Sequence, residues 1–195
     1  ALIALEKASL EMIEGQYLDI SYEKRVDTNI EEYMDMISRK TGALIECAFH
    51  LGSLFGNDDA ATVQAFKQCG RHLGLVFQIR DDVLGVWGVE ESTGKPVAAD
   101  IRRTKMCLPV VYALQSASRV DRERLQFLYS NGSPSQGEVD DIMNILECVD
   151  ALEHCQSLGR EYRDRALGVL DSIDIPHSYR RDIDNLATFF LDRQH

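Results

Sequence analysis

The chain has 195 residues and a formal net charge of −11, which is long enough for one domain with a hydrophobic core. An acidic protein is a poor match for nucleic acid or an anionic membrane surface, so we expect neither as a partner. No apolar run approaches the ~18 residues of a membrane span, and no signal peptide is visible. The five cysteines include no Cys-x-x-Cys pair. Their pattern favours buried free thiols in a reducing, cytoplasmic setting.

Long helices are predicted for the first half of the chain. Only four prolines occur, none in the first 95 residues, and proline interrupts helix interiors. Apolar positions at helical spacing predict helices over residues 1–20, 28–56 and 58–87. The second of these begins at a capping box formed by Thr28 and Glu31.

The second half of the chain is predicted to form a loop and then shorter and longer helices. Their expected ranges are 88–104 for the loop, then 105–118, 121–130, 135–173 and 176–193 for the helices. Ser135 and Glu138 form a capping box, and Pro176 separates the last two helices. No strand alternation or internal repeat occurs, so we predict a single all-α domain over residues 1–195.

The helix over residues 58–87 carries two adjacent carboxylates, Asp81 and Asp82. Gln78, both aspartates and Gly85 fall at i, i+3, i+4 and i+7, so we expect them to share one face. The rest of this helix is mostly apolar, and such a helix is buried. Because carboxylates in an apolar setting are costly unless paired, we predict that this stripe faces a cavity or a ligand.

Positively charged residues follow this helix, at Lys95 and Lys105, with Asp100 between them. Mg²⁺ typically binds through one or two carboxylates together with substrate phosphates. The pattern therefore indicates a site for a divalent metal and a phosphate, in which the metal supplies the positive charge that an acidic chain lacks. The alternative is a solvated helix face with a fortuitous pair of aspartates.

Four short blocks of sequence occur in a fixed order between residues 15 and 110. They are Gly15-Gln16-Tyr17-Leu18-Asp19, then Lys40-Thr41-Gly42, then Phe77-Gln78-x-x-Asp81-Asp82-x-Leu84, then Thr93-Gly94-Lys95-Pro96 with Asp100-Ile101 and Lys105-x-x-Leu108-Pro109-Val110. Together they resemble the trans-isoprenyl diphosphate synthases, the polyprenyl synthetase family. The last two blocks are similar to the second aspartate-rich region of that family. The resemblance covers roughly the C-terminal two thirds of a usual member.

The resemblance implies an isoprenoid-synthase-type helical bundle around a central cavity, with the N-terminal helices missing. It also implies Mg²⁺-dependent prenyl transfer, in which isopentenyl diphosphate attacks the cation formed from an allylic diphosphate. The product would be a longer polyprenyl diphosphate, of the farnesyl or geranylgeranyl class or longer, and the enzyme would be a homodimer.

The resemblance also assigns roles to individual residues. Asp81 and Asp82 would bind Mg²⁺, directly or through water. The diphosphate would be held by Lys40, Lys95, Lys105 and Gln16. The alternative for Lys40 is a lysine that extends to solvent from a buried face.

Further residues would act around the reacting carbons. Thr41 and Gln78, with Lys40, would form the catalytic group, and Thr41 and Gln78 would flank the carbons themselves. Asp19 and Asp100 would orient metal-bound water or the lysines. Gly42, beside Thr41, would let a diphosphate approach the helix closely. For Asp19 the alternative is an ordinary amphipathic helix end.

Two departures from the family pattern leave alternatives open. Gly85 stands where Asp-Asp-x-x-Asp would place its third aspartate. The first aspartate-rich motif belongs before Gly15, so we expect N-terminal helices outside this chain and an inactive fragment. A non-catalytic regulatory subunit of a synthase is the first alternative. A class I terpene cyclase is the second, although Phe66 stands where its motif requires glutamate.

Three other charged features are predicted to lie outside the site. Asp140 and Asp141 resemble an aspartate-rich motif, but they follow a helix cap, where acidic residues favour the helix dipole. Glu46 and His50 are expected to form a local buried hydrogen-bonded pair. Arg103 is expected to be a surface charge.

Overall fold

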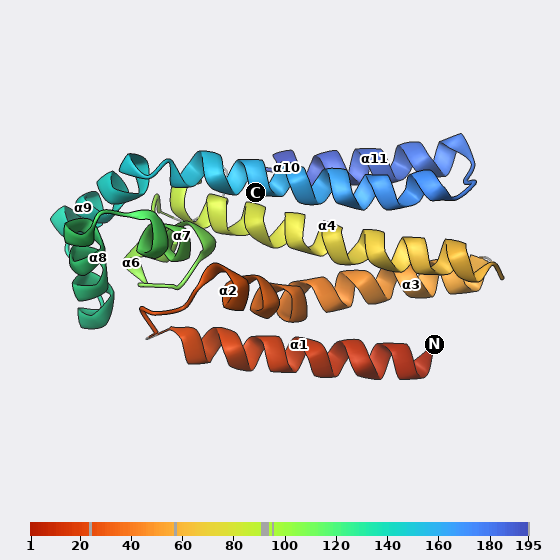
Figure 1. Ribbon diagram of the computed structural model, residues 1–195, viewed down its shortest axis with the longest axis horizontal. Helices are drawn as coiled ribbons and strands as arrows, with labels where there is room; N and C mark the ends of the chain where they lie inside the picture. Colours follow the sequence, from red (N-terminus) through yellow and green to blue (C-terminus); the bar gives the residue numbers. More distant parts are fainter. Residues whose placement is uncertain (24, 57, 91–93, 95, 195) are drawn as a thin grey trace.

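The computed structural model describes residues 1–23, 25–56, 58–90, 94 and 96–194. Every regular element in these residues is helical, which confirms the predicted all-α class (Figure 1). The α-helices are α1 (Leu2–Tyr22), α2 (Ile30–Ile37), α3 (Ala43–Gly56), α4 (Ala60–Trp87), α6 (Ala99–Arg102), α7 (Leu108–Ser116), α8 (Arg119–Asn131), α9 (Gln136–Cys148), α10 (Ala151–Gly168) and α11 (His177–Asp192). A π-helix, η1 (Ser38–Gly42), joins α2 to α3, and a 3-10 helix, η2 (Val169–Ser172), follows α10.

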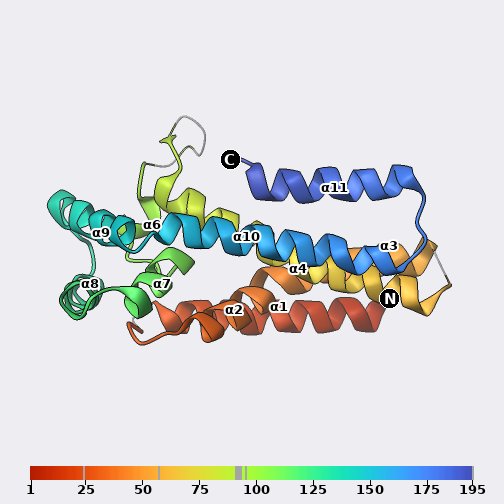
Figure 2. The ribbon, with the colours of Figure 1, turned by 45° about the horizontal axis from the view of Figure 1, so that its top comes forward.

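The long helix α4 forms the centre of the molecule. Helices α1, α2 and α3 lie along one side of it and α10 and α11 along the other, while α6 to α9 gather at one end (Figures 1 and 2). The most extensive contacts of α4 are with α3 and α10. Because neighbours cover α4 on several sides, its C-terminal half is apolar over most of its surface, as expected for a buried helix.

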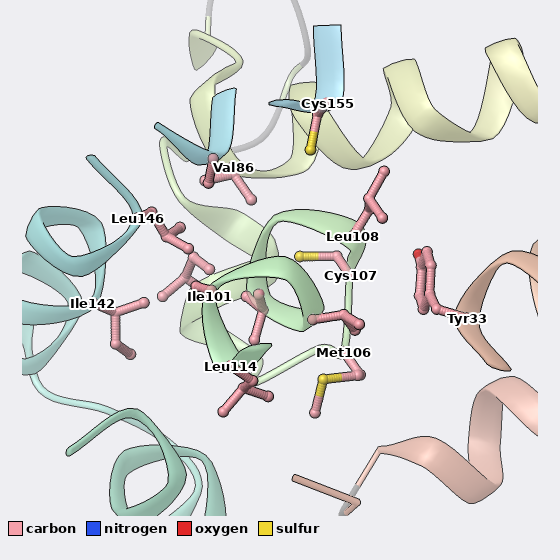
Figure 3. Packing of buried hydrophobic residues seen from close by; sticks show 14 of the residues in the cluster. Tyr33, Val86, Ile101, Met106, Cys107, Leu108, Leu114, Ile142, Leu146 and Cys155 are labelled. Atoms are coloured by element: carbon pink, nitrogen blue, oxygen red, sulfur yellow. The ribbon is translucent and has the colours of Figure 1, made fainter. Parts of the chain in front are cut away.

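The hydrophobic core has two parts. The larger cluster gathers side chains from α2, the C-terminal half of α4, α6, α7 and α9, and it includes Tyr33, Ile101, Leu108 and Leu146 (Figure 3). The smaller cluster lies towards the other end of α4 and includes Leu73. Each fully buried leucine or isoleucine stabilises the fold by about 1.5–3 kcal/mol. The larger cluster therefore stabilises the C-terminal half of α4.

Helix boundaries agree with the sequence at several points and differ at one cap. The helix predicted over 58–87 is α4, capped by Asp59, whose side chain accepts a hydrogen bond from the Thr62 N–H. The capping box at Ser135 is confirmed. The predicted box at Thr28 is wrong by one residue, because Asn29 is the cap and bonds reciprocally with Glu32.

The predicted continuous helix over 135–173 is wrong. Asp150 adopts a left-handed conformation with φ of 52°, and the chain turns there between α9 and α10. Inside the predicted 88–104 loop, the structure has the short helix α6. Neither feature is marked by glycine or proline at the point where the backbone changes direction.

The cysteines are free, and four of them are buried, as predicted. Cys148 is exposed, so the prediction of burial is wrong at that position. Among the described residues, no helix combines the length and apolar character that crossing a membrane would require.

Candidate active site

Lys40 lies in the π-helix η1, opposite the end of α1. A π-helical turn inside a longer helix is rare and often occurs at functional sites. The backbones come close because Gly15 has no side chain: a Cβ there would lie 2.2 Å from the backbone nitrogen of Lys40. This close approach brings the Lys40 Nζ within 2.5 Å of an Asp19 carboxylate oxygen. The lysine is therefore held by its partner on α1.

Thr41, the next residue of η1, faces α4 instead. A Cβ at Gly74 of α4 would lie 2.6 Å from the Cα of Gly42, so two glycines let these helices touch. Gly42 is buried in this contact. The expectation that Gly42 lets a diphosphate approach is therefore wrong: it lets α4 approach. At this distance the Thr41 hydroxyl donates a 2.6 Å hydrogen bond to the Gln78 side-chain oxygen.

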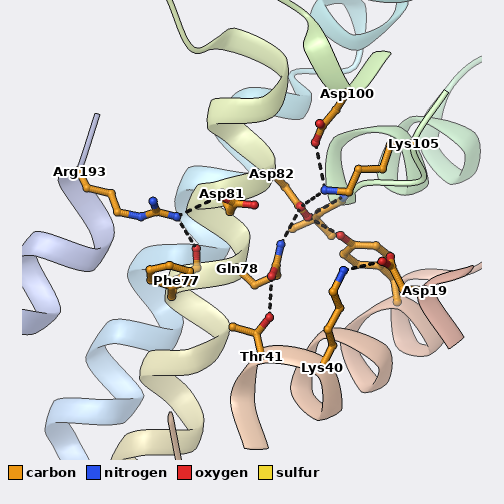
Figure 4. Close-up of polar contacts among 12 residues, drawn as sticks. Asp19, Lys40, Thr41, Phe77, Gln78, Asp81, Asp82, Asp100, Lys105 and Arg193 are labelled. Atoms are coloured by element: carbon orange, nitrogen blue, oxygen red, sulfur yellow. Dashed lines mark hydrogen bonds and ion pairs between the residues drawn. The ribbon is translucent and has the colours of Figure 1, made fainter. Parts of the chain in front are cut away.

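Asp82 is completely buried and accepts three hydrogen bonds (Figure 4). One carboxylate oxygen accepts from the Gln78 amide at 3.2 Å and lies 3.7 Å from the Lys105 ammonium. The other accepts from the Tyr33 hydroxyl at 2.5 Å and from the Leu108 N–H at 3.1 Å. A carboxylate offers about four lone-pair positions; three of them accept hydrogen bonds here, and the Lys105 ammonium lies close enough for an ion pair.

The electrostatics of this cluster follow from burial. Burial raises the pKa of Asp82, against the opposing effects of Lys105 and the hydrogen bonds. Burial also lowers the pKa of Lys105, but Asp82 and Asp100 outweigh it and raise that pKa above its ordinary value. Burial and the neighbouring Asp82 raise the pKa of Tyr33, which keeps its hydroxyl as a donor. Lys105 therefore remains an ammonium ion at neutral pH.

Asp81 points away from this cluster. Its side chain is 47% exposed and its Oδ1 lies 3.3 Å from the Nη2 of Arg193, just beyond α11. The prediction that Asp81 and Asp82 share one face is wrong. Successive residues of an α-helix are about 100° apart, so Asp82 turns into the core while Asp81 turns towards α11 (Figure 4).

Asp100 occupies the space beside Gly85. A Cβ at Gly85 would lie 2.2 Å from the Asp100 Oδ2, closer than any real contact. The same oxygen accepts a 3.1 Å hydrogen bond from Lys105. A carboxylate thus does stand next to position 85, but it comes from α6.

A polar cavity of about 610 Å³ opens beside this cluster, between the end of α1, the region of α6 and the end of α8. Its lining includes Asp19, Asp100, Lys105 and Arg103. Arg103 is exposed, but it lines this cavity, so its prediction as an ordinary surface charge is incomplete. The lining also includes Glu23, so two basic and three acidic side chains surround the cavity, and the basic ones could exchange internal ion pairs for contacts to an anionic ligand.

One described residue named from the sequence does not join this group. Gln16 is exposed on α1, and none of the hydrogen bonds among the described residues of the cluster involves it. Thr93 and Lys95 lie outside the described residues.

The charged pairs set aside from the sequence have other partners. Asp140 accepts from Gln136 and Asp141 pairs with Arg124, both at the surface. Glu46 forms ion pairs with Arg71 and Lys67. The predicted hydrogen bond between Glu46 and His50 is therefore wrong.

The described residues contain no group of three histidine, cysteine or acidic side chains placed to hold a metal ion. This arrangement still fits Mg²⁺, which is usually held by one or two carboxylates together with substrate phosphates. Asp81 is half-exposed and could provide one such carboxylate. Asp82 could not bind a metal directly without giving up the hydrogen bonds of Tyr33, Gln78 or Leu108.

Two residues that contact the adjacent aspartates were not found from the sequence. Tyr33 reads as an ordinary apolar position of a helix, and it lies 49 residues from its partner Asp82. Arg193 lies 112 residues from Asp81. No local pattern signals either contact, because both depend on how α2 and α11 pack against α4.

Comparison with known proteins identifies the family of this chain. The family model described as polyprenyl synthetase matches residues 1–146. The chain belongs to this family. The resemblance read from the four sequence blocks is thereby confirmed, and residues 15 to 110, which carry those blocks, lie wholly inside the matched range.

Curated relatives are similar along the whole chain. A short chain isoprenyl diphosphate synthase from Methanothermobacter thermautotrophicus is 39% identical over 100% of this chain and 59% of its own length. A (2E,6E)-farnesyl diphosphate synthase from Mycobacterium tuberculosis is 31% identical over 100% of this chain and 55% of its own. The chain thus spans less than two thirds of these relatives.

Solved structures share the fold. The geranylgeranyl pyrophosphate synthetase from Pyrococcus horikoshii superposes with a TM-score of 0.90 at 33% identity, over 98% of this chain and 58% of that one. A polyprenyl synthase from Caulobacter crescentus, complexed with calcium and isoprenyl diphosphate, gives 0.91 at 25% identity, over 100% and 59%. The helical bundle is therefore that of the isoprenyl synthases.

Proposed function

We propose that this chain forms part of the active site of a Mg²⁺-dependent prenyl diphosphate synthase. The enzyme would condense isopentenyl diphosphate with an allylic diphosphate to make a longer prenyl diphosphate. The observation that carries the proposal is the continuous polar chain from Thr41 through Gln78 and Asp82 to Lys105, which ends beside the polar cavity. Family membership supports the same reaction.

Binding of the allylic diphosphate would use the lysines that now pair with carboxylates. Lys40 is held by Asp19, and Lys105 is held by Asp100. The cavity is lined by Asp19, Asp100 and Lys105. A diphosphate could replace the aspartates as the lysines' partner, because phosphate oxygens accept charge-assisted hydrogen bonds as carboxylates do. Lys95 and Gln16 would complete the binding group. Asp19 and Asp100 would then orient the lysines or metal-bound water.

Ionisation of the substrate would release pyrophosphate, so charge must be stabilised as it develops. Mg²⁺ bound near Asp81 would supply Lewis-acid stabilisation of the departing pyrophosphate. Asp82 would hold Lys105 charged and oriented, which makes it a preorganised donor towards the same anion. Because three hydrogen bonds and an ion pair fix Asp82, this arrangement needs little rearrangement during the reaction.

Thr41 and Gln78 would flank the reacting carbons. Their mutual hydrogen bond fixes the Gln78 amide, whose nitrogen donates to Asp82 and whose oxygen accepts from Thr41. The proton lost after condensation would leave with pyrophosphate. As in the sequence-based expectation, the enzyme would be a cytoplasmic homodimer, and its product would belong to the farnesyl or geranylgeranyl class or be longer.

A second candidate is a non-catalytic regulatory subunit of a synthase. Gly85 favours it, because the third aspartate of the motif is absent and Asp100 fills the space. The terpene cyclase alternative has no comparable support, since Phe66 replaces the glutamate that its motif requires.

The test is a Mg²⁺-dependent assay of the full-length protein with labelled isopentenyl diphosphate and C5, C10 or C15 allylic diphosphates. We expect a defined prenyl diphosphate product and its loss in Asp81→Asn. The matched control is Asp182→Asn, which removes an exposed carboxylate from α11 and should leave turnover unchanged. Full activity of Asp81→Asn would contradict the metal assignment. Absence of product from folded protein that binds Mg²⁺ and pyrophosphate would favour the regulatory subunit.

A further inference from the structure

The C-terminal end of α11 places a cation directly on Asp81. The Arg193 Nη2 lies 3.3 Å from the Asp81 Oδ1 and 3.3 Å from the Phe77 carbonyl oxygen. Its guanidinium carbon lies 4.1 Å from the centroid of the Phe77 ring (Figure 4). The Arg193 side chain is only 9% exposed, whereas the Asp81 side chain is 47% exposed. The arginine is therefore an ordered part of the α4 surface.

This position is fixed by the backbone as well as by the side chain. The Arg193 carbonyl accepts a 2.7 Å hydrogen bond from the Arg80 side chain on α4. The Arg193 N–H donates to the Phe189 carbonyl at 2.9 Å, which ends α11. Phe190 packs edge-on against Phe77 at 5.2 Å between ring centroids. The last turn of α11 is thus attached to α4 around Asp81.

The charge of Arg193 matters for any metal at this carboxylate. A guanidinium keeps its proton at every pH at which proteins function. A divalent cation that binds Asp81 would lie within a few ångströms of this fixed positive charge, and like charges at that distance repel. The arginine contact and a metal on Asp81 would therefore weaken each other.

We propose that Arg193 is a resident counter-ion that competes with the divalent metal for Asp81. In the metal-free protein it neutralises Asp81 and holds the last turn of α11 on α4. Binding of the metal with a diphosphate releases Arg193 and loosens that turn. The proposal rests on the proposed function, because it assumes that Asp81 is a metal ligand, and it adds a link between site occupancy and the C-terminal helix.

The affinity test compares three proteins by calorimetry, with inorganic pyrophosphate titrated in the presence of Mg²⁺. Arg193→Gln should bind about two- to fivefold more tightly than the natural protein, the range expected for removal of a partly exposed ion pair. Arg181→Gln is the matched control, because it removes an exposed positive charge from the same helix. Its affinity should not change.

Hydrogen exchange gives a second measurement that does not depend on turnover. In the natural protein, amides of residues 186–193 should exchange slowly, and Mg²⁺ with pyrophosphate should speed their exchange severalfold. In Asp81→Asn and in Arg193→Gln, the same amides should exchange fast before Mg²⁺ and pyrophosphate are added. Their exchange rate should not rise further on addition.

The outcomes separate this proposal from the proposed function. If neither the natural protein nor Arg193→Gln binds pyrophosphate with Mg²⁺, the proposed function fails, and the competition fails with it. If the natural protein binds it but Arg193→Gln binds equally or more weakly, the competition alone is wrong. Slow exchange of residues 186–193 in Asp81→Asn would likewise overturn the role of Arg193.

Discussion

The two adjacent aspartates of α4 lie on different sides of the helix and differ in burial and in their partners. On the side of α2 and α7, Asp82 is fully buried and receives three hydrogen bonds and an ammonium ion. On the side of α11, Asp81 is 47% exposed and pairs with one arginine. The same residue type is thus part of the core on one side and available to a ligand on the other. Chemistry at such a motif depends on the direction of each side chain more than on the number of carboxylates.

The largest expected effect comes from removing the buried carboxylate. Asp82→Ala should destabilise the fold by about 3–5 kcal/mol, because it leaves Lys105 and the Tyr33 hydroxyl without their buried partner. Urea unfolding measures this loss. Asp81→Ala is the control on the other side of the helix, and it should cost less than about 1 kcal/mol. Equal losses in the two variants would contradict the contrast between them.

A smaller effect is expected at Gly85. Gly85→Ala should destabilise by about 1–3 kcal/mol, because the new Cβ must push the Asp100 carboxylate away from Lys105. In an Asp100→Ala background the same change should be neutral or stabilising, since alanine favours a helix over glycine by up to about 1 kcal/mol. A double-mutant cycle of unfolding free energies tests this coupling. Additive effects would show that Asp100 does not fill the space beside Gly85.

The smallest expected effect is a dependence on pH at Lys105. Asp82 and Asp100 raise its pKa above the ordinary 10.5 in spite of burial, so the folded state holds this proton more tightly than the unfolded state. The resulting stabilisation is fully present below about pH 10.5 and is lost as the pH rises through the folded-state pKa. The difference in unfolding free energy between the natural protein and Lys105→Gln should therefore shrink above that pH. A constant difference would show that the ion pairs contribute nothing.

Most of the fold could be predicted from local sequence. Proline placement and helical spacing mark most of the helices, and the capping box at Ser135 marks where α9 begins. The break at Asp150 could not be predicted, because an aspartate in the left-handed region has no signature that separates it from aspartate in a helix. Periodicity alone therefore joined α9 and α10.

The candidate site was predictable as a set of sequence blocks and less so as a geometry. Lys40, Thr41 and Gln78 do come together with Asp82 and Lys105 around the end of α4. The direction in which each side chain points depends on contacts between helices that are far apart in the sequence. The same is true of Tyr33 and Arg193, which lie 49 and 112 residues from their aspartates.

The π-helix η1 has a consequence for how this site can change in evolution. Its wider turn lets consecutive residues face two helices, so Lys40 pairs with Asp19 on α1 while Thr41 bonds to Gln78 on α4. A π-turn differs from an α-turn by one residue. Losing that residue would restore a regular helix and rotate one flanking segment by about 100° relative to the other. Lineages that keep both contacts are therefore expected to tolerate side-chain substitutions between Ser38 and Gly42 more readily than a change in its length.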